Sequence, residues 1–334
     1  MQASFYTKEN DKVRCLLCPH HCLINDGHLG ICRVRRNDGG RLVAETYGEI
    51  AAIYLDPIEK KPLYHFYPGS NILSIGSVGC NMQCTFCQNC DISQVGIREY
   101  GWLKKYTVDQ LINEVRSIKG NLGIAFTYNE PTVFFEYMLD VAKETNSLGY
   151  KNVMITNGYI EEGPLLKLLP FIDAFNVDLK AFTEDFYHKQ TRSHLEPVKQ
   201  TLLHLQKAQK HTEITNLIIP GLNDSVREFS SMVDWICNEL GRSTVLHLSR
   251  YFPRHQLTRP ATPDSTLLHF FEIAQLKLDY VYIGNVGNQL QGHDTICAKC
   301  KSVVIRRSGY NVDASGINTN GACNKCGCPV VVNA

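Results

Sequence analysis

The alternation of strand and helix patterns between residues 72 and 283 is the feature that most constrains the fold. Buried-strand patterns occur at 72–75, 124–127, 153–156, 174–179, 213–219 and 245–248. Between them, apolar residues recur with helical spacing at 107–119, 132–147, 161–169, 195–210 and 225–240. Such alternation indicates right-handed βαβ units and a parallel sheet, with 280–283 as an additional strand. Periodicity alone leaves a barrel and an open doubly wound sheet as alternatives.

Size and charge narrow the class of protein. A chain of 334 residues with 44% hydrophobic content can bury one large core and still carry small appended modules. Its net charge of +1 gives no broad electrostatic field that would attract nucleic acid or a membrane surface. No apolar run approaches the roughly 20 residues of a membrane span, and residues 1–11 are too polar for a signal peptide. We therefore expect a cytoplasmic protein without a membrane or nucleic-acid partner.

The chain contains 14 cysteines, and all but Cys237 fall into three groups. In a cytoplasmic protein, grouped cysteines favour metal ligation over disulfides. The central group, Cys80, Cys84 and Cys87, follows the first strand with the spacing C-x3-C-x2-C. Three thiolates can bind three irons of a 4Fe-4S cluster and leave the fourth iron open to a small molecule. A zinc knuckle or three buried free thiols is the alternative.

The central group resembles the signature of radical S-adenosylmethionine (SAM) enzymes, C-x3-C-x-aromatic-C, with Phe86 at the aromatic position. This resemblance implies an α/β fold, a partial (β/α)6 barrel, with a 4Fe-4S cluster on the three cysteines. It also implies an oxidoreductase-type enzyme that reductively cleaves SAM to a 5'-deoxyadenosyl radical, which abstracts hydrogen from a substrate. Cys90 extends the run; as a fourth ligand it would close the cluster and leave an electron carrier. We expect Cys90 to stay off the iron.

Polar residues stand at the ends of several predicted strands, where a cofactor across a barrel mouth would meet them. Resemblance to the pyruvate formate-lyase activating enzyme branch implies that SAM is contacted by Phe86, Asn129, Glu130, Thr156, Asn157, Asp178, Lys180 and His247. The pair Asn129 and Glu130 replaces the Gly-Gly-Glu that is common in relatives, so this part of the match is incomplete. The sequence does not identify a catalytic residue beyond the cluster ligands.

Two further cysteine groups flank the predicted barrel. The N-terminal group is Cys15, Cys18, Cys22 and Cys32, and its spacing suits zinc or an iron-sulfur cluster. We favour zinc slightly, because metal binding would supply folding energy to a short polar segment; an electron-relay cluster is the alternative. The C-terminal group resembles a zinc ribbon or rubredoxin-like module, with Cys328 as a spare thiol and Cys297, Cys300, Cys323 and Cys326 as ligands of zinc or iron.

These groups predict three parts: an N-terminal metal-binding segment at 1–66, the radical SAM core at 67–290 and the C-terminal module at 291–334. A narrower resemblance, to the radical SAM component of the AmmeMemoRadiSam system, rests on 18–33, 127–132 and 282–297. It implies a Memo-like protein and a companion-domain protein as partners, besides an electron donor such as flavodoxin or ferredoxin. Two rival functions are a glycyl radical enzyme activase and a non-catalytic electron carrier.

Overall fold

The computed structural model describes residues 1–287 and 290–333. Its centre is an eight-stranded sheet in the order β15-β14-β13-β12-β11-β10-β8-β7. Every pair of neighbours from β8 to β15 is parallel, and only β7 runs antiparallel, beside β8. The strands are β7 (Ala52–Pro57), β8 (Asn71–Gly76), β10 (Asn121–Phe126), β11 (Lys151–Thr156), β12 (Ala174–Asp178), β13 (His211–Ile218), β14 (Val245–Arg250) and β15 (Tyr280–Gly284).

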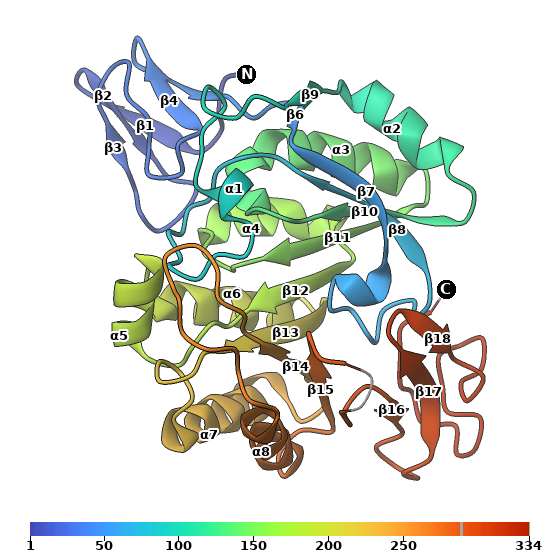
Figure 1. The fold of residues 1–334 in the computed structure, drawn as a ribbon. Coiled ribbons are helices and arrows are strands. Elements are labelled where there is room, and N and C mark those ends of the chain that lie inside the picture. The colour runs from blue at the N-terminus through green and yellow to red at the C-terminus, as the bar shows by residue number, and fades with distance from the viewer. Residues whose placement is uncertain (288–289, 334) are drawn as a thin grey trace.

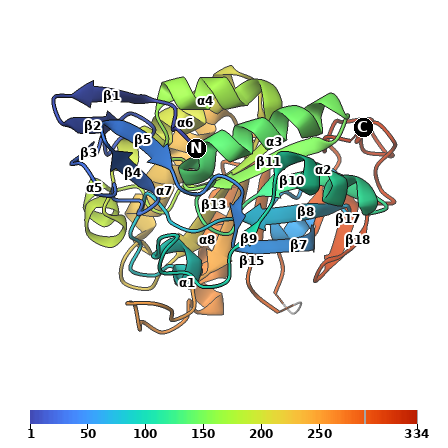
Figure 2. The same ribbon diagram turned by 90° about the horizontal axis from the view of Figure 1, so that it is seen from above.

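The sheet curves into an open, partial barrel with helices on its outer face (Figures 1 and 2). The expected α/β fold and the additional seventh parallel strand are therefore confirmed. The longer helices are α2 (Val108–Ser117), α3 (Phe135–Ser147), α4 (Glu162–Leu168), α6 (Leu195–Lys207), α7 (Val226–Trp235) and α8 (Asp264–Gln275). The shorter ones are η1 (Ile58–Lys60), α1 (Cys90–Ser93), η2 (Pro131–Phe134), η3 (Leu169–Phe171), α5 (Glu184–Phe186), η4 (Tyr187–Thr191) and η5 (Ile236–Leu240).

Local sequence explains the helix positions well. The expected helix at 107–119 begins where Thr107 and Gln110 form a reciprocal capping box, which satisfies two backbone N–H groups at the start of α2. The expected helix at 225–240 is α7 followed by the π-helical turn η5. Helix α8 was not among the expected elements, because it follows a long loop and has no strand-like run before it.

The N-terminal segment is built from small sheets that the sequence did not predict. Strands β1 (Tyr6–Glu9), β2 (Lys12–Cys15) and β3 (Leu23–Ile24) form one sheet, and β4 (Arg35–Asp38) with β5 (Arg41–Ala44) forms a hairpin. A two-strand pair joins β6 (Glu49–Ile50) to β9 (Lys104–Lys105). The segment lies beyond the arrowheads of β11 and β12 (Figure 1) and shares the main hydrophobic core. Within the expected segment 1–66, β7 joins the barrel sheet itself.

Residues 58–67 fill the amino-terminal part of the barrel interior. Ile58, Leu63 and Phe66 are buried in one cluster with Ile72, Val153 and Ala174, which stand in the first halves of their strands, and with Ala125, near the end of β10. This plug lies beneath the main cavity, which opens at the carboxyl ends of the strands.

The C-terminal module packs at the opposite end of the sheet from the N-terminal segment (Figures 1 and 2). Its strands β16 (Thr295–Ile296), β17 (Val303–Ser308) and β18 (Asn311–Asp313) form a three-stranded sheet. Its core includes Cys297 and Cys323 and is continuous with Val245, Tyr280 and Tyr282 of the barrel. Within the described residues, no helix combines the length and the apolar character that a membrane span requires.

Candidate functional site

A cavity of about 510 Å³ opens at the carboxyl ends of the parallel strands. Parallel α/β sheets place ligands at this end, because the loops that leave the strands converge there. All three central cysteines and seven of the eight expected SAM-contacting residues line the cavity: Cys80, Cys84, Cys87, Phe86, Asn129, Glu130, Thr156, Asn157, Asp178 and Lys180. Residues drawn from several strand ends and their loops are thus brought together in one place.

Two glycines allow the cysteine loop to leave β8 sharply. A side chain at Gly76 would place Cβ only 2.6 Å from the carbonyl oxygen of Thr127. Gly79, immediately before Cys80, has φ +83°, and a Cβ there would lie 2.5 Å from the carbonyl oxygen of Cys32. Only glycine combines this left-handed conformation with so close an approach of backbone.

The cysteine loop is held by backbone hydrogen bonds to two distant segments. The amides of Gln83 and Thr85 donate to the carbonyls of Thr191 and Gln190, each at 2.9 Å. The amide of Gln256 donates to the carbonyl of Thr85 at 2.9 Å. The loop therefore has a fixed path although it contains almost no regular secondary structure.

The sulfur of Cys80 receives hydrogen bonds that suit a cluster ligand. The Met82 amide lies 3.4 Å from Cys80 Sγ, and Asn157 Nδ2 lies 3.7 Å from it. Burial raises the pKa of Cys80 well above its usual value and that of Cys84 to about 12. These thiols would therefore stay protonated at neutral pH unless a cation binds them, as iron does.

Glu130 is a fully engaged carboxylate. Its Oε1 accepts hydrogen bonds from the Thr132 amide, the Thr132 hydroxyl at 2.6 Å and the Thr156 hydroxyl at 2.8 Å. Its Oε2 accepts from the Asn157 amide at 2.8 Å. Burial raises the pKa of Glu130, and the hydrogen bonds oppose that rise. Glu130 thus joins the ends of β10 and β11 and places a buried carboxylate in the cavity wall.

Asn129 holds the turn before the first cysteine. Its side-chain oxygen accepts from the Ser77 amide at 3.1 Å, and its Nδ2 donates to the Gly79 carbonyl at 2.9 Å. Because both side-chain groups are used in this way, Asn129 fixes the backbone that carries Cys80.

Asp178 and Lys180 form an ion pair at the end of β12, with Nζ 2.9 Å from Oδ2. Lys180 Nζ also lies 5.9 Å from the centre of the Phe86 ring. Burial lowers the pKa of Lys180, but the charges of Asp178 and Cys84 outweigh it and raise the pKa above its usual value. Lys180 is therefore a permanent cation beside the cysteine loop.

His247 is the expected contact that the structure does not bring to the cavity. On β14, Ser249 lines the cavity, and His247 lies two residues earlier, about 7 Å further from the mouth. Its Nε2 is 2.6 Å from Glu213 Oε2, and its ring stacks on Tyr282 with centroids 5.4 Å apart. The structure corrects the placement: His247 belongs to a buried polar network beneath the cavity.

That network links the barrel floor to the C-terminal module. Arg307 Nη1 donates to Thr295 Oγ1 at 2.7 Å, and Thr295 Oγ1 lies 2.8 Å from the Tyr282 hydroxyl. The Tyr282 hydroxyl lies 2.7 Å from His65 Nε2, and His65 Nδ1 lies 2.6 Å from the Val330 carbonyl. Burial lowers the pKa of His65 to about 4, so this side chain is neutral.

Sequence reasoning missed the cavity floor. The segment 60–62 lines the cavity, and Lys61 is buried with Nζ 2.7 Å from Asp56 Oδ2 and 4.6 Å from the centre of the Tyr128 ring. Other unexpected lining residues are Asn176, Thr215, Ser249 and Asn285. No motif marks the segment 60–62, because the plug is located by tertiary packing. The inward-facing strand residues 176 and 215 could have been found from the strand alternation.

Cys90 is not among the residues that line the cavity. It begins the short helix α1, and its Sγ lies 3.6 Å from Asp91 Oδ1. The three cysteines that line the cavity therefore fit a 4Fe-4S cluster with one open iron, and the polar wall beside them fits a zwitterionic cofactor.

Comparisons with known proteins agree with this geometry. The family described as the Radical SAM superfamily matches residues 74–236. The uncharacterized protein MJ0808 of Methanocaldococcus jannaschii is 42% identical over 328 residues, covering 97% of this chain and 96% of that protein. The chain belongs to the radical SAM superfamily. A 4Fe-4S cluster and SAM are the cofactors typical of this superfamily.

More distant relatives of this radical SAM protein include an activating enzyme. The (2S)-3-sulfopropanediol dehydratase activating enzyme of Klebsiella oxytoca is 23% identical over 145 residues, 42% of this chain and 46% of the relative. The crystal structure of Streptococcus suis SuiB bound to S-adenosylmethionine aligns with a TM-score of 0.52 at 14% identity, covering 68% of this chain and 53% of that one. This likeness shows a shared fold.

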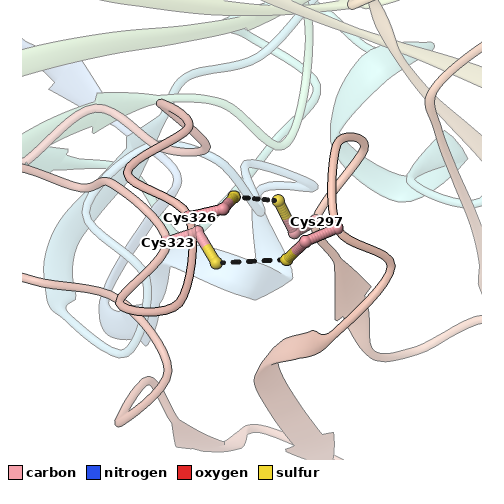
Figure 3. Close-up of side chains that lie close together, drawn as sticks. Cys297, Cys323 and Cys326 are labelled. Carbon is pink, nitrogen blue, oxygen red and sulfur yellow. Dashed lines mark hydrogen bonds between the residues drawn. The ribbon is translucent and has the colours of Figure 1, made fainter.

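The C-terminal cysteine group of this radical SAM protein converges on a single point. The sulfur atoms of Cys297, Cys300, Cys323 and Cys326 all lie within 4.8 Å of one another. The sulfurs of Cys297 and Cys326, both labelled in Figure 3, lie 3.6 Å apart, and those of Cys300 and Cys323 are also 3.6 Å apart. The Ser302 hydroxyl, 2.9 Å from Cys300 Sγ, lowers the pKa of that thiol to about 6. Cys328 points elsewhere, with Sγ 3.6 Å from the Pro329 carbonyl.

The N-terminal cysteine group has a different arrangement. Cys15, Cys18, Cys22 and Cys32 all line one small cavity between the N-terminal sheets and the barrel. Among the His, Cys, Asp and Glu side chains that the structure describes, only the C-terminal group brings three or more ligand atoms within 4.8 Å of one another. The N-terminal sulfurs are therefore more widely spread.

Proposed function

We propose that this chain reductively cleaves SAM at a 4Fe-4S cluster held by Cys80, Cys84 and Cys87, and that the radical product abstracts hydrogen from a substrate. One observation carries the proposal. The three cysteines line the same cavity as seven residues expected to contact SAM, whereas Cys90, the nearest candidate for a fourth ligand, does not line it. The cluster, when bound, supplies an open iron for SAM and the electron for its cleavage.

The residues of the chain hold this site in three ways. Asn129 fixes the turn before Cys80, so that the first ligand has a defined position. Asp178 and Lys180 place a charge pair beside the loop, where they can bind the charged end of SAM. Glu130 presents a negative charge in the wall, which favours an ammonium group nearby.

The test is an anaerobic assay of the reconstituted protein. After reduction with dithionite, SAM is added, and 5'-deoxyadenosine and methionine are quantified for the wild type and for Cys80→Ala. We expect both products from the wild type and less than about a hundredth of that rate from the variant. Cys90→Ala is the matched control and should retain both cluster and cleavage. A reduced cluster that never cleaves SAM, with or without candidate substrates, would overturn the proposal.

A glycyl radical activase is the second candidate, because one relative is named as an activating enzyme of a dehydratase. In that case the hydrogen donor is a glycine on a partner protein. Mixing the reduced enzyme and SAM with candidate partners would then produce a glycyl radical doublet in the EPR spectrum. The non-catalytic electron carrier is less well supported, because it requires a fourth ligand such as Cys90 on the cluster.

We also propose that the C-terminal group binds one zinc or iron ion. The shortest sulfur separations, 3.6 Å, are close to the roughly 3.8 Å that four thiolates adopt around one tetrahedral zinc. The narrower assignment to the AmmeMemoRadiSam system, with Memo-like and companion-domain partners and a flavodoxin or ferredoxin donor, is supported by the motifs at 18–33, 127–132 and 282–297. Co-purification from cells that express the candidate partners tests it.

A further inference from the structure

The N-terminal cysteine group lines one small enclosed cavity of about 20 Å³. Its four sulfurs share the cavity with Ile24, Val133 and other mainly apolar neighbours. A Cβ at Gly30 would lie 3.6 Å from Cys22 Sγ and 3.2 Å from Ile24, so the absence of a side chain at Gly30 keeps room beside that sulfur. The site therefore combines four thiols with enclosed space.

The spread of the sulfurs separates the two flanking groups. One tetrahedral ion draws four thiolates to within about 3.8 Å of one another, and the C-terminal sulfurs approach this, with two pairs at 3.6 Å and all four within 4.8 Å. A 4Fe-4S cubane holds its four thiolates further apart, at roughly 6 Å. Among the described residues, neither the N-terminal group nor Cys80, Cys84 and Cys87 gathers three sulfurs within 4.8 Å. The N-terminal group thus shares the wider arrangement of the central cluster site.

The N-terminal group also lies directly against the central cysteine loop. Gly79 packs so closely on Cys32 that a Cβ would meet the Cys32 carbonyl at 2.5 Å. Asn81, next to Cys80 in the chain, lines the N-terminal cavity. The Asn81 carbonyl lies 2.7 Å from His20 Nε2. The side-chain Nδ2 of Asn81 donates to the Tyr159 carbonyl at 2.6 Å. A single residue therefore connects the first central ligand to the wall of the other site.

We infer that Cys15, Cys18, Cys22 and Cys32 hold a second 4Fe-4S cluster that passes electrons to the cluster on Cys80, Cys84 and Cys87. The relay role rests on the proposed function, since it requires a central cluster that consumes electrons. A low-potential one-electron carrier would be oxidised as the N-terminal cluster is reduced from the 2+ to the 1+ state. That electron then reduces the central cluster, the N-terminal cluster returns to 2+, and SAM takes the electron when its carbon–sulfur bond breaks.

The metal assignment is tested without any turnover. In the triple variant C80A/C84A/C87A, which lacks the central site, we expect about four iron and four sulfide per chain after anaerobic reconstitution. Adding Cys18→Ala and Cys22→Ala should remove that iron and sulfide. Adding C297S and C323S to the triple variant instead controls for an iron ion in the C-terminal group, which would carry no sulfide. A triple variant that binds zinc at the N-terminal group, with no sulfide, would overturn the inference.

The relay is tested by EPR of the wild-type chain beside the triple variant, and by the reduction kinetics of Cys18→Ala. With both clusters reduced, their EPR signals should show magnetic coupling that is absent from the triple variant, because the two cysteine groups lie side by side. In Cys18→Ala, reduction of the central cluster by reduced flavodoxin should slow at least tenfold, whereas SAM cleavage by dithionite-reduced enzyme should persist. Uncoupled signals and equal flavodoxin rates would overturn the relay. Failure of SAM cleavage in all chains would instead overturn the proposed function.

Discussion

The two flanking cysteine groups contain the same four ligand atoms but are built in opposite ways. The C-terminal sulfurs converge within 4.8 Å, at the end of the barrel remote from the cavity. The N-terminal sulfurs surround a small cavity, and the Cys32 carbonyl packs against Gly79 in the loop that carries Cys80. Ligand type and number are therefore poor guides to a metal site. The spacing that the fold imposes on the sulfurs, and the distance to the reactive centre, distinguish a structural ion from a redox group.

Removal of the C-terminal metal should give the largest effect. The module has few buried apolar residues of its own, so we expect the proposed metal to supply most of its folding energy, about 10 kcal/mol for zinc-binding peptides. In C297S/C326S we expect loss of about one zinc or iron ion per chain and fast hydrogen exchange throughout β17. Cys328→Ser is the control and should change neither. Unchanged exchange in the double variant would show that the module folds without metal.

Removing the buried Arg35 charge tests whether the ion pair beside the N-terminal cysteines stabilises that segment. Arg35 Nη2 lies 2.6 Å from Glu136 Oε2, both side chains are buried, and Arg35 lines the cysteine cavity. Arg35→Met leaves Glu136 buried without its partner and should cost about 3–5 kcal/mol of unfolding free energy. The neighbouring Arg36 is more exposed, so Arg36→Met should cost under about 1 kcal/mol. Urea unfolding of both variants provides the measurement; equal losses would contradict this account.

The pH dependence of stability should report on the attachment of the C-terminal module. His65 has a pKa of about 4 in the folded chain and about 6.5 when unfolded. Protonation therefore favours unfolding: this contribution is complete above pH 6.5 and is lost as the pH falls to 4, about 3 kcal/mol in total. His65→Gln should flatten this part of the profile. The difference between the urea midpoints of the wild type and His65→Gln at each pH measures the contribution of His65, since cluster loss in acid affects both proteins alike. Parallel profiles would argue against a neutral His65.

A side chain at Gly79 should affect both the stability of the chain and the link between the two sites. Gly79→Ala adds a methyl group that would lie 2.5 Å from the Cys32 carbonyl, so the backbone has to shift, and this cost comes on top of about 1–2 kcal/mol for the left-handed conformation. We also expect weaker magnetic coupling between the two reduced clusters. Gly120→Ala, at φ +75° and with no atom within 4 Å, is the matched control. Thermal unfolding and EPR separate the two effects; unaltered coupling would mean that this contact does not set the distance.

The sequence predicted the parallel core well because its signals are local. Alternating apolar strands and amphipathic helices identify βαβ units, and the polar strand ends at Glu130, Thr156 and Asp178 lie together for the simple reason that parallel strands end at one edge. It failed for His247, because alternation gives the face of a strand but not the depth in the barrel at which a side chain stands. It also missed the segment 60–62, whose place in the cavity floor depends on long-range packing.

Residue types at short spacing were enough to identify the superfamily, the central cysteine group and the core strands. The use of the flanking cysteines depends instead on the folded chain. The spacing of four cysteines in a sequence does not give the distances between their sulfurs, which only folding sets. In the folded chain the C-terminal sulfurs lie within 4.8 Å of one another, whereas the N-terminal cysteines line a small cavity. The contact of Gly79 with Cys32 joins residues 47 positions apart, and no local pattern specifies it.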